Sequence, residues 1–170
     1  MFLNYIKEFF VKKSLKNNLS NENDKVFSRN VQTIGLLIDE SNFDHSEALI
    51  KELTLHGIAS ENIITAVFTD NFKEKETYLR PTFGKKHISW NGEIAEDFLN
   101  EFVNLEFDVL LSYYDDENIF LMLITNKSKA KFKVGFSKID SRLNRLMINT
   151  ELQNYKLFIS ELFRYLKNIK

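Results

Sequence analysis

Apolar runs of strand length alternate with amphipathic stretches along most of the chain, and residues 107–137 show this pattern most clearly. Residues 107–113 form an apolar run of strand length. Asp115 and Asp116 supply the acidic side chains that favour a helix start, and residues 119–124 are the buried part of that helix. A Lys-rich run follows as the next strand. This order predicts one crossover unit of a parallel sheet.

A second unit of the same kind lies nearer the N-terminus. Residues 31–38 and 62–68 are apolar runs, the second rich in β-branched residues, and they predict two buried strands. Between them Asp44 and Glu47 have the spacing of a capping box, and Gly57 stands where a helix would end. The pattern predicts a right-handed strand, helix, strand connection.

The middle of the chain is harder to interpret. Residues 69–92 show no clear period and predict a long excursion with a short extended piece at residues 86–90. Residues 93–104 have apolar positions at helical spacing and predict a helix capped by Ser89 or Asn91.

The C-terminal part predicts a very short fifth strand at residues 146–148 and a closing helix within residues 150–169, where Thr150 and Gln153 have capping-box spacing. Together these elements predict a single Rossmann-like, three-layer α/β domain over residues 31–170, with a mostly parallel sheet of four or five strands.

The first residues form a separate amphipathic pattern. Residues 1–20 predict a helix, and residues 21–30 are polar and predict a linker. The apolar face of the helix includes Phe2, Ile6, Phe9 and Phe10. Such a helix packs on its own domain, docks on a partner, or lies on a membrane surface through residues 1–16.

Composition removes several classes of function. The chain of 170 residues has no Cys, which excludes thiolate zinc sites, Cys nucleophiles and disulfides. Its three His residues are scattered, so no metal centre is predicted. No apolar stretch reaches the roughly 18 to 20 residues that span a bilayer, and Lys7 and Glu8 interrupt the pattern of a secretory signal. We expect a cytoplasmic protein.

Carboxylates follow the predicted strands. In open parallel sheets ligands bind at the carboxyl ends of the strands, so Asp39, Asp70, Asp115 and Asp116 are candidate catalytic residues of an enzyme that handles a small ligand or phosphate. Carboxylates there could hold Mg²⁺, but acidic residues equally suit the first turn of the next helix. Gly-rich phosphate-binding motifs are absent, so we expect no dinucleotide, and we predict neither metal nor other cofactor.

Basic residues dominate residues 127–145. Lys residues alternate with small or apolar residues, which indicates a strand with one side in water. The candidate partner-binding cations are Lys131, Lys133, Arg142 and Arg145. They could bind an acidic protein, RNA or an anionic lipid surface. The other interpretation is a solvated basic face that balances the acidic residues 93–108, since the net charge is −1.

Four sequence segments carry a resemblance to a known family: WNG, FDVLLSYY, KAKFKVGF and RLNRLMINTE, at residues 90–92, 107–114, 129–136 and 142–151. Over most of the chain from Val31 onward they resemble an uncharacterised family of short, flavobacterial-type bacterial proteins. This implies one α/β domain and no assigned activity. At the level of the fold, FDVLLSYY, a helix and AKFKVGF are similar to the amino-terminal Rossmann-like half of heptosyltransferase-type glycosyltransferases, whose second domain has no counterpart in this chain.

The sequence therefore favours a non-catalytic Rossmann-like module that binds a macromolecular partner, in the first place a protein. The contact would be made by the N-terminal helix, the basic residues 127–145, or both. The alternatives are a small-ligand or phosphate-handling enzyme at the strand ends, and an RNA- or ribosome-associated protein.

Overall fold

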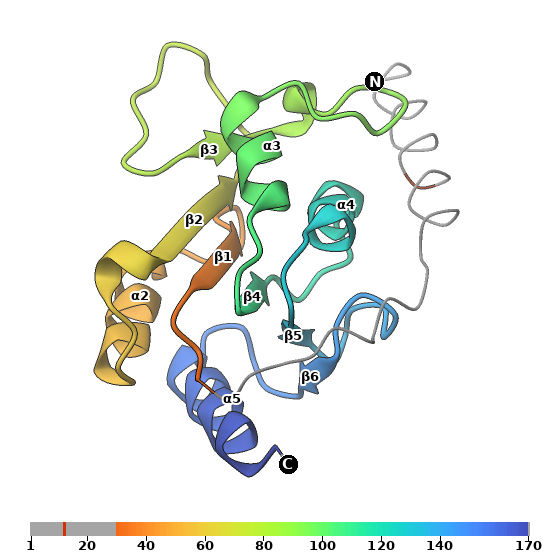
Figure 1. The fold of residues 1–170 in the computed structure, drawn as a ribbon. Helices are drawn as coiled ribbons and strands as arrows, with labels where there is room; N and C mark the ends of the chain where they lie inside the picture. The colour runs from red at the N-terminus through yellow and green to blue at the C-terminus, as the bar shows by residue number, and fades with distance from the viewer. Residues whose placement is uncertain (1–11, 13–29, 170) are drawn as a thin grey trace.

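A six-stranded sheet forms the centre of the computed structural model, which describes residue 12 and residues 30–169 (Figure 1). The strands lie in the order β3-β2-β1-β4-β5-β6, and every neighbouring pair is parallel. Their bounds are β1 Ile34–Asp39, β2 Ile63–Phe68, β3 Thr82–Phe83, β4 Val109–Tyr113, β5 Lys133–Phe136 and β6 Leu146–Ile148. The Rossmann-like α/β class is confirmed. The expected four or five strands are wrong, because the two-residue β3 is too short to leave a pattern.

Helices cover both faces of this sheet. They are α2 Ser46–Leu55, α3 Asp97–Asn104, α4 Ile119–Lys127 and α5 Tyr155–Asn168, with short 3₁₀ helices at Ser60–Asn62 and Lys85–His87. Helices α2 and α5 contact each other on one face, and α3 and α4 contact each other on the opposite face (Figure 1). The chain runs outward from β1 to β3 and then restarts at β4 on the other side of β1, so the strand order reverses between β1 and β4.

The core is apolar on both sides of the central strands. Every residue of β1 and of β4 is buried. A parallel strand covered by helices on both faces requires such a continuous apolar sequence rather than an alternating one. This explains why residues 34–39 and 109–113 were recognisable as strands from their composition alone.

Helix α2 ends as predicted but begins differently. Gly57 has φ +95° and closes the C-terminus, with its N–H donating to Thr54 O and the N–H of Ile58 donating to Leu53 O. At the other end the N-cap is His45, and it makes no side-chain capping bond. The predicted capping box of Asp44 and Glu47 is therefore wrong: Glu47 is ion-paired with Arg80 instead.

The excursion between β2 and α3 is held by local bonds. Its predicted extended piece at residues 86–90 is only partly right, because residues 85–87 are 3₁₀ and only Ile88 pairs, in an antiparallel bridge to Ile94. Ser89 closes the turn between them, its N–H donating to Glu93 O and its hydroxyl accepting from the N–H of Glu93. Helix α3 consequently begins at Asp97 rather than at residue 93, and neither predicted residue caps it.

The closing helix keeps its predicted apolar face but starts later. Phe158, Ile159, Leu162 and Leu166 are buried, as their spacing predicted. The capping box at Thr150 and Gln153 is wrong, since Asn154 is the N-cap. The carbonyl of Leu152 instead accepts a hydrogen bond of 2.6 Å from the Tyr113 hydroxyl, which holds this segment against β4.

Residues 127–134 alternate between exposed and buried positions as predicted, but most of them are not a strand. Lys127, Lys129 and Lys131 are exposed, while the residues between them are buried. Helix α4 ends at Lys127 and β5 begins only at Lys133. The connection between them bends at Lys131 and Phe132. Its N–H groups donate to residues outside the strands, Lys129 N to Val103 O and Lys131 N to Phe107 O.

The predicted helix and linker at residues 1–20 and 21–30 fall almost wholly outside the described residues, and so do Phe2, Ile6, Phe9 and Phe10. Among the helices that the structure describes, none has the length and apolar character that crossing a bilayer requires.

Candidate functional site

Asp39 occupies the end of β1, beside the point where the strand order reverses. Its side chain is almost fully buried, with 3% of its surface exposed. One carboxylate oxygen accepts the N–H of Ser41 at 3.0 Å, and the other accepts the amide N–H of Asn42 at 2.9 Å. The carboxylate therefore fixes the turn that leaves β1.

Burial also changes the acidity of this group. It raises the pKa of Asp39 above 3.8, against the lowering effect of the hydrogen bonds from Asn42 and Ser41. The nearby carboxylate of Asp70 adds to the rise. A buried acid with a raised pKa at the end of a strand is a recurrent feature of functional sites, although turn-forming carboxylates share it.

The loops after β2 and β3 complete one side of the site. The N–H of Asp70 donates to the hydroxyl of Ser41 at 2.9 Å, and the ammonium of Lys85 lies 3.5 Å from the Asp70 carboxylate. Three loops that follow three neighbouring strands are thereby joined. Lys85 was missed in the sequence because β3, which places it, gives no signal.

The loop after β4 forms the other side. Asn118 is the N-cap of α4, with its side chain accepting the N–H groups of Phe120 and Leu121. The predicted helix-start role of Asp115 and Asp116 is therefore taken by Asn118. Asp115 instead lies 3.6 Å from the ammonium of Lys138.

Between these loops lies an open cleft of about 300 Å³. Its lining is mostly polar and comprises Asp39, Asn42, Asp70, Lys85, Asp116, Glu117, Asn118, Ile119 and Phe120. Three of the four candidate catalytic residues thus share one cleft, and Asp115 is outside its lining. Within residues 30–169 and at residue 12, no three His, Cys, Asp or Glu side chains are arranged to hold a metal ion.

Tyr113, which ends β4, and Tyr114, which follows it, both belong to the core. Tyr113 and Tyr114 are 0% and 1% exposed. Burial raises the pKa of both hydroxyls well above the ordinary 10.0. The Tyr114 hydroxyl is bonded to that of Thr125 at 2.8 Å, and the Tyr113 hydroxyl to Leu152 O. Both hydroxyls therefore stay protonated at neutral pH and position backbone and side chains.

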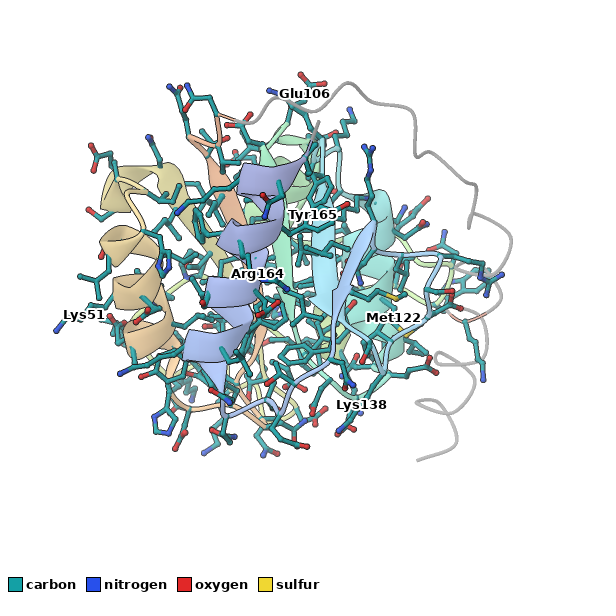
Figure 2. The ribbon with its side chains drawn as sticks, turned by 90° about the horizontal axis from the view of Figure 1, so that it is seen from below. Lys51, Glu106, Met122, Lys138, Arg164 and Tyr165 are labelled. Carbon is teal, nitrogen blue, oxygen red and sulfur yellow. The ribbon has the colours of Figure 1, made fainter. Side chains whose placement is uncertain are left out.

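The predicted basic residues come from the segments on both sides of β5. Lys131, Lys133 and Arg145 lie at the amino end of β5, since the N–H of Arg145 donates to Lys133 O. Arg142 belongs to the loop that leads from β5 to β6, and it is paired with Asp140. Glu106, just before β4, and Lys138, just after β5, lie on opposite sides of the molecule (Figure 2).

Each predicted cation has a partner. Lys131 lies 2.9 Å from Asp108, and Lys133 donates to Asn126 O at 3.2 Å. The guanidinium of Arg145 stands over the ring of Phe132, 5.5 Å from its centroid. These contacts orient the side chains while leaving the head groups of Lys131 and Arg145 in contact with water.

The strand order and the cleft at its reversal define a Rossmann-like α/β protein. The model of a family of unknown function, DUF6913, matches residues 7–169, and the chain belongs to this family. The predicted membership of an uncharacterised family is thereby confirmed; the flavobacterial origin and the likeness to glycosyltransferases stay predictions. No curated protein matches the chain, and no solved structure does.

Proposed function

We propose that the protein is a binding module that docks an acidic partner protein at the amino ends of its strands. The cationic surface there consists of Lys127, Lys129, Lys131, Lys133 and Arg145, and it is called the amino-end surface below. Asp108 and Glu106 both act on Lys131, and Glu93 lines a pocket together with Lys127. Five basic side chains thus stand beside three acidic ones.

A single observation carries the proposal. The carboxylate of Asp108 accepts the N–H groups of Gln32 and Thr33 at 2.9 and 3.0 Å and also the ammonium of Lys131. Residues 32 and 33, near the start of the continuously described chain, therefore lie directly beside the amino-end surface. We propose that the amphipathic pattern of residues 1–20 and the cations act on the same partner, the first through apolar contact and the second through charge complementarity.

An acidic protein fits this surface better than RNA. Recognition of RNA bases requires exposed aromatic side chains beside the cations. The exposed aromatic residues of the described chain are Trp90 and Tyr165. Of these two, Tyr165 lies beside the cations, with its ring 6.1 Å from that of Phe132, over which Arg145 stands. One exposed ring offers a single stacking position, whereas recognition of RNA uses several. Phe132, within the basic run, is buried.

Charge reversal at the two ends of β5 tests the proposal. Lys127→Glu/Lys129→Glu changes the amino-end surface and keeps the Asp108–Lys131 pair, while Lys138→Glu/Arg142→Glu makes the same charge change in the loop after β5. Tagged full-length proteins would be used as bait in native extract, with quantitative mass spectrometry. We expect the captured amount of an acidic partner to fall at least tenfold with the first variant and to stay unchanged with the second. Added salt should weaken its binding to the wild type.

A deletion gives a further test. Deletion of residues 1–20 should weaken binding of the same partner, because residues 32 and 33, which follow this segment in the chain, lie beside the cations. Equal binding by wild type and the Lys127→Glu/Lys129→Glu variant would contradict the proposal, as would a nuclease-sensitive or vesicle-dependent interaction, which would assign the surface to RNA or to lipid.

A second candidate function rests on buried Asp39. Its cleft holds four carboxylates, of Asp39, Asp70, Asp116 and Glu117, against the single ammonium of Lys85. This charge balance favours a small cationic or neutral polar ligand over phosphate. Titration with a panel of amino sugars, amino acids and nucleosides should raise the midpoint of thermal unfolding, and Asp116→Asn should abolish the rise. No shift with any member of the panel would count against a ligand of these classes.

A further inference from the structure

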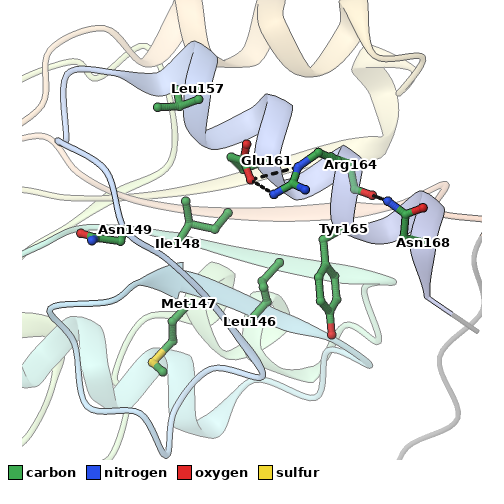
Figure 3. Close-up of a pocket in the computed structure, with 9 residues that line it drawn as sticks. All are labelled: Leu146, Met147, Ile148, Asn149, Leu157, Glu161, Arg164, Tyr165 and Asn168. Atoms are coloured by element: carbon green, nitrogen blue, oxygen red, sulfur yellow. Dashed lines mark hydrogen bonds and ion pairs between the residues drawn. The ribbon is translucent and has the colours of Figure 1, made fainter.

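An open edge and a helix form a groove at the end of the sheet. Strand β6 is the last strand of the sheet and pairs with β5 on one side only. Beside it runs α5, and between them lies a groove of about 570 Å³ (Figure 3). The groove is lined by Leu146, Met147, Ile148, Asn149, Leu157, Glu161, Arg164, Tyr165 and Asn168. None of these residues belongs to the strand-end cleft or to the amino-end surface.

Short length is the one protection against pairing that this edge has. Edge strands are normally kept very short or carry a charge, a Pro or a bulge that prevents another strand from adding to them. Strand β6, Leu146–Ile148, is short, but it consists of three apolar residues in regular register with β5. Leu157 and Tyr165 of α5 are 43% and 41% exposed. Met147, which points away from α5 while Leu146 and Ile148 point toward it (Figure 3), is 40% exposed. Exposed apolar side chains on both sides of an edge strand indicate a surface that is covered by a partner.

A pair of opposite charges lies in the middle of the strip of α5 that faces the groove. Glu161 and Arg164 are one turn apart on the helix, and they form an ion pair with each other (Figure 3). Leu157 and Asn168 flank this pair at equal distance, one apolar and one polar, so the self-complementarity rests on the charged pair. When two such helices run antiparallel, Glu161 of each faces Arg164 of the other. A surface that complements itself in this way is the property of a two-fold interface.

We propose that the groove binds a second copy of this chain. Strand β6 pairs antiparallel with β6 of the second copy about a two-fold axis at Met147, so that the sheet continues from one copy into the other. The two α5 helices then lie on the same face of the joined sheet, with Glu161 and Arg164 exchanged between copies.

Strand and helix place this axis at the same level. Helix α5 runs back along β6, so Leu157 lies toward the Asn149 end of the groove and Tyr165 toward the Leu146 end (Figure 3). The middle of the helix strip, between Glu161 and Arg164, therefore stands near the middle of β6. A single two-fold rotation can therefore pair both β6 with β6 and α5 with α5. If Glu161 and Arg164 lay near one end of β6, the two pairings would need different axes.

Cross-linking at the axis is the sharpest test, because only a two-fold pairing places a residue beside its own copy. The chain has no Cys, so Met147→Cys introduces a single thiol. We expect this variant to form a disulfide-linked dimer under mild oxidation with oxidised glutathione. Leu55→Cys, at an exposed position of α2, is the matched control, and most of it should remain without a disulfide cross-link.

Charge exchange provides the second test, read by sedimentation velocity over a range of protein concentrations. The wild type should dimerise, and Glu161→Arg should weaken the dimer about tenfold or more, because Arg then faces Arg164 of the other copy. Glu161→Arg/Arg164→Glu restores both pairs and should restore the dimer. Lys51→Glu on α2 controls for a charge change elsewhere, and circular dichroism confirms that each variant is folded.

A monomeric wild type at all concentrations would overturn the proposal. So would equal cross-linking of Met147→Cys and Leu55→Cys, or an exchanged variant that stays as weak as the single one. If the groove is instead occupied by residues 1–29 or by an extended peptide of another protein, the wild type stays monomeric and neither charge variant changes its mass.

Discussion

Because Gly135 has no side chain, Asn144 of the loop between β5 and β6 can pack directly against the backbone of β5. The backbone of β5 at Gly135 lies against the side chain of Asn144, so closely that a Cβ atom would overlap its amide nitrogen. Asn144 is 6% exposed, and within the described chain neither polar atom of its amide has a hydrogen-bond partner. The contact therefore depends on shape rather than on bonding.

Gly135→Ala should accordingly lower the free energy of unfolding by about 1–3 kcal/mol through overpacking. Asn144→Ala should cost less, because it removes a buried amide without partners. In the double variant the added methyl group occupies the space of the lost amide, so the two effects should be less than additive. Urea unfolding of all four proteins measures this, and strict additivity would show that the two residues do not compete for space.

The raised pKa of Asp39 makes the contribution of this residue to the free energy of unfolding depend on pH. Because its folded-state pKa is raised above 3.8, the folded protein binds the proton more tightly than the unfolded chain. The contribution of Asp39 to stability therefore falls as pH rises from about 3.8 through the higher folded pKa. Asp39→Asn does not titrate, so its stability relative to wild type should increase over this interval.

Urea unfolding at several pH values between acidic and neutral measures the difference. Asp44→Asn, which removes an exposed carboxyl near α2, corrects for the loss of one negative charge. A stability difference between Asp39→Asn and wild type that is independent of pH would contradict the prediction.

At the scale of the elements, three buried hydroxyls fasten α4 to β4. The hydroxyl of Thr125 lies 3.0 Å from that of Ser112 and 2.8 Å from that of Tyr114, and it donates to Leu121 O. Thr125→Val keeps the shape of the side chain and leaves two buried hydroxyls without this partner. We expect a loss of about 1–3 kcal/mol in unfolding free energy.

Thr125→Ser is the matched control for this element, since it keeps the hydroxyl and removes only a methyl group. It should cost about 1 kcal/mol. If Thr125→Val and Thr125→Ser lowered the free energy of unfolding equally, packing rather than the hydroxyl network would hold α4 on the sheet.

At the scale of the whole molecule, Asp108 joins segments far apart in the sequence. It accepts N–H groups of Gln32 and Thr33, which are 76 and 75 residues away, and the ammonium of Lys131. Burial alone would raise the pKa of Asp108, but these hydrogen bonds outweigh it and hold the pKa below 3.8. Its stabilising effect is therefore complete above about 3.8 and is lost as pH falls through the lower folded pKa.

Asp108→Asn should lower the unfolding free energy by about 1 kcal/mol at neutral pH. The deficit should shrink below about pH 3.8, as the wild-type carboxyl takes up its proton. Denaturant titrations at neutral and acidic pH measure both values. An undiminished deficit in acid would show that shape, rather than charge, accounts for the role of Asp108.

Particular residues show which features of the fold could be predicted from the sequence. The apolar runs that became β1 and β4, the apolar face of α5 and the C-cap at Gly57 were predictable, because burial and backbone conformation restrict residue types locally. Capping boxes at Asp44 and Thr150 failed, since Arg80 and Tyr113 compete for those segments from distant parts of the chain. Strand β3 and Lys85 were missed because two residues carry no period.

The sequence by itself therefore determined the α/β class, the parallel crossover units and which residues enter the core, because each depends on periodicity within one element. Only the tertiary structure decided that Asp39, Asp70 and Asp116 share one cleft, that Arg145 joins Lys133 at the amino end of β5, and that β6 is an apolar edge strand beside α5. These properties depend on strand order, which brings together residues that no local pattern connects.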